Sequence, residues 1–137
     1  KMILDKMTRF KHYLSICNSG PSEILAAVAL KHSDELLRRS LEIIRGNLSI
    51  ADDFFAKYEH LFKNNPPMAG PIAFHQIKIE EPIDAFCEDL VQKSGVLLLP
   101  AGIYGYKGPF FRMGYGRKSF ETCLKVFEQY LIDRKLA

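Results

Sequence analysis

The first half of the chain carries its apolar residues at helical spacing. A first helix is predicted over residues 1–14, and a second begins at Gly20-Pro21, because proline is favoured in the first turn of a helix. The polar segment Asn18-Ser19-Gly20 separates the two helices. The apolar positions of the first helix share one face: Ile3, Met7, Phe10 and Leu14.

A third and longer helix is predicted from Ser33, a favoured capping residue, with Asp34 and Glu35 next to it where the helix dipole favours acidic residues. The apolar stripe continues at helical spacing for about thirty residues, to Phe62. The Asn-Asn-Pro-Pro segment at 64–67 ends it. A helix of this length often bridges two lobes of a protein, so we place a domain boundary inside it, near Ser40.

The second half of the chain mixes strands and helices. Residues 71–80 are expected to form a strand. Its alternation of apolar and polar residues shifts phase between Phe74 and Ile77, which indicates either a bulge or partial burial of both faces. A helix over 82–93, a short apolar strand over 96–99, a strand over 110–115 and a last amphipathic helix follow. The order strand-helix-strand-strand-helix predicts an α+β fold, a small two-layer sandwich with helices over one face of a sheet.

The composition narrows the class of protein. Apolar residues make up 47% of the chain and charged residues 26%, which is a globular balance, and no apolar run reaches the ~20 residues that span a bilayer. The net charge of +3 neither requires nor excludes an anionic partner. Three cysteines without CxxC spacing predict free thiols, a reducing compartment such as the cytoplasm, and no zinc site. The chain begins with Lys1 and shows no signal peptide, so a part of a longer protein is expected.

Arg112 is the most informative single residue. It lies in the predicted strand 110–115, between bulky apolar residues and shortly before Gly114 and Gly116. A guanidinium in such a position is costly unless it faces a cleft or finds a partner, and its planar fork suits a carboxylate. It either binds a ligand or pairs with a surface glutamate, and the pattern alone slightly favours the ion pair.

Several segments together resemble the closing part of class I/II aminotransferases of fold type I, which use pyridoxal phosphate (PLP). Residues 95–100, Gly-Val-Leu-Leu-Leu-Pro, and 111–116, Phe-Arg-Met-Gly-Tyr-Gly, are similar to two strands of that family. Residues 16–23 resemble the segment after its cofactor-binding lysine, and residues 47–48 and 68–70 fall in the expected order. The resemblance covers essentially the whole chain.

The resemblance implies a division into a helical remnant of the large cofactor-binding domain, residues 1–39, and a small C-terminal domain, residues 40–137. It implies that Arg112 binds the α-carboxylate of an amino-acid substrate. Gly70 would border the substrate pocket, and Asn18 would lie near the active site of the partner subunit in a homodimer. The implied reaction is transfer of an amino group between an amino acid and a 2-oxo acid. The resemblance also includes lyases and synthases of the same fold, so the reaction type and the choice of amino acid are left open.

The chain lacks other parts that the same family needs. Its cofactor-binding lysine usually follows a Ser-x-x-Lys type pattern, and no serine of this chain has a lysine three residues later. The aspartate and the phosphate-binding loop of the cofactor site belong to the family's N-terminal lobe. We therefore expect PLP to bind the full-length protein only, and the chain alone to be inactive.

Two alternative functions compete with this interpretation. An RNA-recognition module is suggested by the order of the elements and by residues 107–114, which partly imitate the RNP1 pattern. Against it, Pro109 and Gly114 occupy aromatic positions of that pattern, and no fourth strand follows the last helix. A nucleic acid is therefore not predicted as a partner. A membrane is not predicted either, because no apolar run is long enough to span one. A purely structural interaction domain would require Arg112 to be buried in an ion pair.

Simpler explanations apply to the remaining candidates. His75, on the predicted strand 71–80, is expected to be a structural histidine with satisfied hydrogen bonds rather than a general base. Tyr104, Tyr106 and Lys107, on a glycine-rich loop, are expected to form a solvated hairpin tip. Core positions rather than a cofactor-binding surface are expected for a set of large apolar residues: Phe54, Phe55, Leu61 and Phe62.

Overall fold

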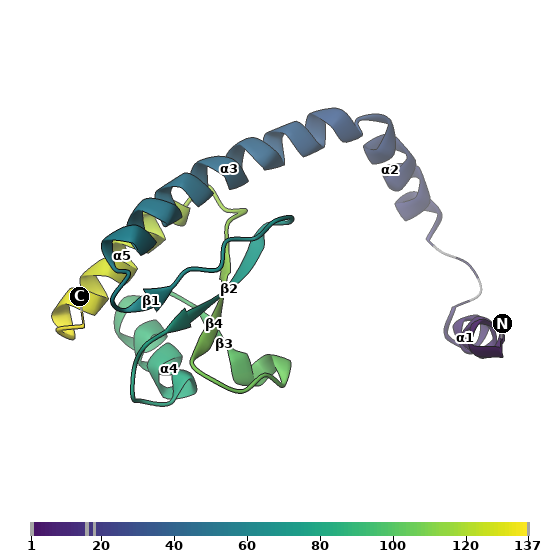
Figure 1. Cartoon of the computed structure of the whole chain (residues 1–137). Coiled ribbons are helices and arrows are strands. Elements are labelled where there is room, and N and C mark those ends of the chain that lie inside the picture. Colours follow the sequence, from purple (N-terminus) through teal and green to yellow (C-terminus); the bar gives the residue numbers. More distant parts are fainter. Residues whose placement is uncertain (1, 16, 18, 137) are drawn as a thin grey trace. The chain divides into compact units, whose positions relative to one another are not determined.

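A computed structural model of the chain describes residues 2–15, 17 and 19–136 (Figure 1). The chain divides into two compact units, unit 1 (Lys1–Arg38) and unit 2 (Arg39–Ala137). The assignment of these units to a large and a small domain stays a prediction.

Unit 1 consists of α1 (Met2–Leu14), α2 (Gly20–Lys31) and the beginning of α3 (Ser33–Lys57). Pro21 stands in the first turn of α2, as its sequence position predicted. Neither α1 nor α2 buries any of its described residues, and their large apolar side chains are exposed.

Unit 2 is an α+β fold, which confirms the predicted class. After α3, its elements in chain order are β1 (Phe62–Lys63), β2 (Ile72–Ile77), α4 (Ile83–Ser94), β3 (Leu99–Pro100), the 3₁₀ helix η1 (Ala101–Tyr104), β4 (Phe110–Gly114) and α5 (Phe120–Asp133). The strands form one antiparallel sheet with the order β1-β2-β4-β3. Figure 1 shows α4, α5 and the C-terminal half of α3 gathered on one side of this sheet.

The central strands alternate strictly between the two faces of the sheet. In β2, the side chains of Ala73, His75 and Ile77 are buried towards the helices, and those between them are more accessible. The pairing of β2 with β4 is continuous from Ile72–Gly114 to Gln76–Phe110, so the bulge considered from the sequence is not present. The sheet therefore has one face that forms the core and one face that the helices leave open.

Aromatic rings make up much of the core between the sheet and the helices. Phe54 of α3 lies 5.8 Å from Phe127 of α5, and Phe127 lies 6.4 Å from Phe111 of β4, measured between ring centroids. Phe86 of α4 and Phe127 lie 6.4 Å apart in the same way. Each such ring contributes about 1.5–3 kcal/mol through burial, so three helices and the sheet share one apolar core.

The C-terminal end predicted for the long helix is wrong. It was expected to reach Phe62, but α3 ends at Lys57, and the chain turns at residues 58–61 into β1, a strand that the sequence did not predict. Phe62 pairs with Ile77 of β2 at the edge of the sheet. The expectation that Phe54, Phe55, Leu61 and Phe62 are core residues is confirmed, because all four are buried.

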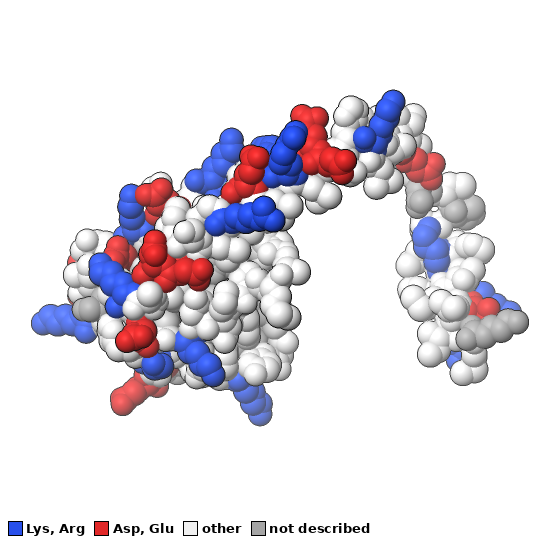
Figure 2. Space-filling model, turned by 45° about the horizontal axis from the view of Figure 1, so that its top comes forward, with Lys and Arg blue, Asp and Glu red and all other residues white. Residues whose placement is uncertain are grey.

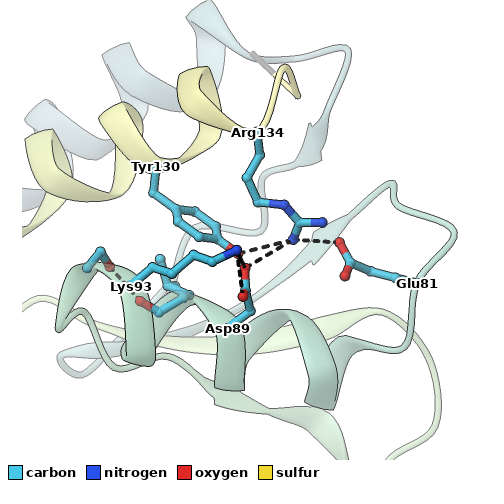
Figure 3. Close-up of polar contacts among 7 residues, drawn as sticks. Glu81, Asp89, Lys93, Tyr130 and Arg134 are labelled. Carbon is cyan, nitrogen blue, oxygen red and sulfur yellow. Dashed lines mark hydrogen bonds and ion pairs between the residues drawn. The ribbon is translucent and has the colours of Figure 1, made fainter.

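A polar cluster joins α4 to α5 on their exposed side (Figure 3). Asp89 of α4 accepts a hydrogen bond from the Tyr130 hydroxyl at 2.7 Å and forms an ion pair with Lys93 at 2.9 Å. Arg134 contacts Glu81 at 2.9 Å and donates to the Tyr130 hydroxyl at 3.1 Å. Hydrogen bonds from Lys93 and Tyr130 hold the pKa of Asp89 below its usual value. The cluster thus fixes the two helices that cover the sheet.

Two further predictions from composition can be compared with the structure. Cys17, Cys87 and Cys123 are free thiols, as their spacing predicted. None of the helices in the described part of the chain has the length and apolarity that crossing a membrane requires.

Candidate functional site

The candidate site lies on the open face of the sheet, opposite the helices. Because neighbouring residues of a strand point to opposite faces, the burial of Phe111 and Met113 turns Arg112 of β4 towards the open face. Arg112 pairs in register with Phe74 of β2 and with Leu99 of β3. The side chain therefore stands near the middle of the sheet rather than at an edge.

An open hollow of about 630 Å³ on this face contains Arg112. Its walls come from β2, β4 and the segment around η1, and they are aromatic or apolar apart from the guanidinium: Ile72, Ala73, Phe74, Tyr104, Tyr106 and Arg112.

 The hollow thus combines one positive charge with flat apolar surfaces, a combination that suits a small carboxylate attached to an apolar group.

Arg112 has one hydrogen-bonding partner in the hollow. Its Nη1 donates to the hydroxyl oxygen of Tyr104 at 2.9 Å, and the side chain is half-buried. Among the described residues no carboxylate lies within ion-pair distance of the guanidinium, so the surface ion pair considered from the sequence is not formed. The Nε and Nη2 hydrogens, which form the other edge of the guanidinium, donate no hydrogen bond to any acceptor in the part of the chain that the structure describes.

Aromatic rings pack together on the open face of the sheet, which also carries Arg112. Phe74 and Phe110 stack with their ring centroids 5.7 Å apart and their planes at 3°. Tyr106 meets both rings edge-on, at 5.7 Å and 5.3 Å, and Tyr104 meets Phe74 edge-on at 6.1 Å. These contacts position the segment around η1 over the sheet.

The predicted solvated hairpin tip agrees with the structure in that Tyr104, Tyr106 and Lys107 are all exposed. Tyr104 and Tyr106 also line the hollow, and their rings meet Phe74 edge-on. The chain reverses at Gly105, whose φ of 67° is a left-handed conformation that glycine adopts without strain.

Gly70, the second predicted site residue, does not line the hollow. Gly70 is exposed with φ 78°, and it precedes Ile72, the first residue of β2 and part of the hollow's wall. The Tyr115 amide donates to the Pro71 carbonyl at 2.7 Å, which fixes this segment against the end of β4. Gly70 thus borders the hollow along the chain without lining it, and Asn18 lies outside the described residues.

A buried polar network supports the sheet from the opposite face. Nδ1 of His75 accepts a hydrogen bond from the Asn65 amide at 3.3 Å, so the Nε2 hydrogen donates to the Tyr115 hydroxyl at 2.6 Å. The imidazole stacks on Phe55 with ring centroids 4.4 Å apart. Burial lowers the pKa of His75 to about 4. His75 is therefore a neutral structural histidine with both nitrogens satisfied, as predicted.

Asn47 connects α3 to the end of β4. Its side-chain amide donates to the carbonyl oxygens of Tyr115 at 2.7 Å and of Arg117 at 2.8 Å. The residue is buried, so these bonds replace water around two backbone carbonyls. The strand that carries Arg112 is thus anchored to α3 just beyond its C-terminal end.

The described residues do not provide a binding site for PLP. All the lysines among them are exposed, and neither a lysine nor an acidic residue lines the hollow. In the part of the chain that the structure describes, no group of acidic, histidine and cysteine residues is arranged to bind a metal ion.

Comparison with known proteins finds similarity to a synthase and to two PLP-dependent enzymes of known structure. No protein-family model matches the chain. Capreomycidine synthase from Streptomyces vinaceus is 28% identical over 131 residues, which are 94% of this chain and 33% of that enzyme. A PLP-dependent aminotransferase from Streptococcus suis 89-1591 has a TM-score of 0.84 and 27% identity, over 99% of this chain and 36% of that one. The PLP-dependent cyclase OrfR has a TM-score of 0.85 and 23% identity, over 97% of this chain and 37% of the cyclase.

The chain therefore has the fold of one part of PLP-dependent enzymes. It spans about a third of the length of the proteins to which it is similar. One of the two solved structures is named an aminotransferase and the other a cyclase, so the shared fold supports more than one reaction.

Proposed function

We propose that the chain forms the small C-terminal domain, with adjoining helices, of a PLP-dependent aminotransferase. The observation that carries the proposal is the unpaired edge of the Arg112 guanidinium in an open hollow, on a fold similar to a PLP-dependent aminotransferase over 99% of the chain. The reaction is the transfer of an amino group between an amino acid and a 2-oxo acid.

Arg112 binds the α-carboxylate of the substrate in this proposal. Because Tyr104 occupies Nη1, the Nε and Nη2 hydrogens are left to donate in parallel to the two carboxylate oxygens. Such a two-point contact fixes the orientation of the carboxylate as well as its position. The α-carbon next to it is then aligned for reaction, which is a large part of what an enzyme contributes to rate.

The cofactor belongs to the remainder of the enzyme in this proposal. When bound, PLP supplies the electron sink for breaking a bond at the α-carbon. This chain contributes carboxylate binding and shields the substrate from water, and we expect it to be inactive alone. The exposed apolar residues of α1 and α2 are expected to be covered by the large domain or by the second subunit of a homodimer.

A cyclase or synthase reaction is the second candidate. It is favoured by the similarity to capreomycidine synthase, at 28% identity over 94% of the chain. Both candidates use the same carboxylate contact, since each begins with a bound amino acid. Product analysis with a panel of amino acids and 2-oxoglutarate separates them, because only the aminotransferase releases glutamate.

The role of Arg112 is tested by the substitution Arg112→Lys in the PLP-loaded enzyme that contains this chain. A lysine keeps the charge but loses the two-pronged contact, so we expect kcat/KM to fall about 10- to 100-fold, the equivalent of a lost charged hydrogen bond. Steady-state kinetics with the preferred amino acid measure this fall.

Arg117→Lys is the matched control, because Arg117 follows the same strand and its side chain is exposed outside the hollow. The control is expected to keep the kcat/KM of the parent enzyme. An Arg112→Lys enzyme that also keeps it contradicts the proposed carboxylate contact.

A further inference from the structure

The hydrogen bond between Tyr104 and Arg112 joins two elements that come together only in the folded sheet. Tyr104 ends η1, and Arg112 is the central residue of β4. The bond from Nη1 to the hydroxyl oxygen is 2.9 Å long. An arginine side chain has several rotatable bonds, so a fixed acceptor at one end of the guanidinium restricts where its other edge points.

Tyr104 is itself held in place. Its ring meets Phe74 edge-on at 6.1 Å, and the backbone of η1 is closed by the Gly105 amide, which donates to the Gly102 carbonyl at 3.0 Å. Phe74 stands directly beside Arg112 in the register of the sheet. The hydroxyl oxygen is therefore positioned by the same strand pair that carries the guanidinium.

We propose that Tyr104 is a positioning residue, which orients the Arg112 guanidinium so that its Nε–Nη2 edge faces an incoming carboxylate. This inference rests on the proposed function, because it requires that Arg112 binds a carboxylate. It adds that Tyr104, at the end of η1, belongs to the binding site together with Arg112.

Tyr106 provides a matched control on the same segment. It lies two residues after Tyr104, lines the same hollow and packs edge-on against Phe74 and Phe110. Tyr106 is 54% exposed, against 48% for Tyr104. Among the described residues its hydroxyl has no hydrogen-bonding partner, so Tyr106→Phe removes an oxygen without removing a contact to Arg112.

The test is calorimetric titration of the PLP-loaded enzyme with 3-phenylpropanoate and with its uncharged amide, 3-phenylpropanamide. The ratio of the two dissociation constants measures the preference for a carboxylate, independently of turnover. We expect Tyr104→Phe to reduce this preference about 3- to 10-fold, the effect of one hydrogen bond. Tyr106→Phe is expected to leave it within about twofold, and Arg112→Lys to reduce it more than Tyr104→Phe does.

The outcomes separate this inference from the proposed function. If Arg112→Lys leaves the carboxylate preference unchanged, the proposed function fails and the role of Tyr104 with it. If Arg112→Lys reduces the preference but Tyr104→Phe does not, only the role of Tyr104 is overturned. Equal losses in Tyr104→Phe and Tyr106→Phe also overturn it, because a hydroxyl without a bond to Arg112 would then matter as much as the one that accepts that bond. Thermal unfolding of each variant shows whether the fold is kept.

Discussion

Arg112 and His75 occupy opposite faces of the same pair of strands. Arg112 stands on the open face, whereas His75, one residue beyond its register partner Phe74, is fully buried among the helices. The sequence identified both residues, because a charged or polar residue between apolar neighbours stands out in a strand. It did not identify Tyr104, because its hydrogen bond depends on the fold of a loop whose sequence suggests only a turn.

The buried histidine makes a prediction about pH and stability. Its pKa is about 4 in the folded chain and about 6.5 when unfolded. Because the unfolded state binds more protons between these values, the stability that neutral His75 contributes is present above pH 6.5 and is lost as the pH falls towards 4. We expect the free energy of unfolding to decrease by about 2 kcal/mol between pH 7 and pH 5.

Urea unfolding of the chain and of His75→Gln at both pH values measures this loss. Glutamine does not titrate, so its variant is expected to show little of the decrease. His60→Gln, which replaces an exposed histidine, is the control and should keep it. The same decrease in all three proteins would mean that another group is responsible.

At the scale of elements, the spacing of apolar residues predicted most of the helices and strands, but it was less informative about where each of them ends. The apolar stripe of α3 continues through Phe62 at helical spacing, but Phe62 belongs to β1 and pairs with Ile77. Core packing and helical periodicity demand the same residue types there, so the sequence cannot separate them. A two-residue strand such as β1 has no periodicity from which it could be predicted.

Asn47 is the residue on which the connection of α3 to the sheet can be tested. Asn47→Ala leaves the Tyr115 and Arg117 carbonyls without their amide donor, so we expect a loss of about 2–3 kcal/mol in the free energy of unfolding. Asn64→Ala is the control, because its amide bond to Asp52 is exposed, and it is expected to cost less than about 1 kcal/mol. Urea denaturation measures both, and equal effects would contradict the anchoring role.

At the scale of the whole molecule, the chain has the fold of about a third of a PLP-dependent enzyme. The order of motifs predicted this similarity better than any single motif did. The order of motifs could not predict what unit 1 packs against. The large apolar side chains of α1 and α2 are exposed, and only the proposed function assigns them a cover.

The alternative of an RNA-recognition module is less consistent with unit 2 as a whole. An RNA-recognition module has its fourth strand after the last helix. In unit 2 the additional strand is β1, which precedes β2 in the chain. Figure 2 shows Lys and Arg side chains interspersed with Asp and Glu on the visible face, without a large patch of one sign. Binding to a phosphate backbone relies on such a patch.

The central claim is that Arg112 meets the carboxylate of a ligand in the hollow. The most direct measurement is a crystal structure of the PLP-loaded enzyme with 3-phenylpropanoate bound. The account predicts both carboxylate oxygens within about 3 Å of Nε and Nη2 of Arg112, with Nη1 still bonded to Tyr104. A carboxylate bound elsewhere in the active site, with Arg112 facing solvent, would contradict it.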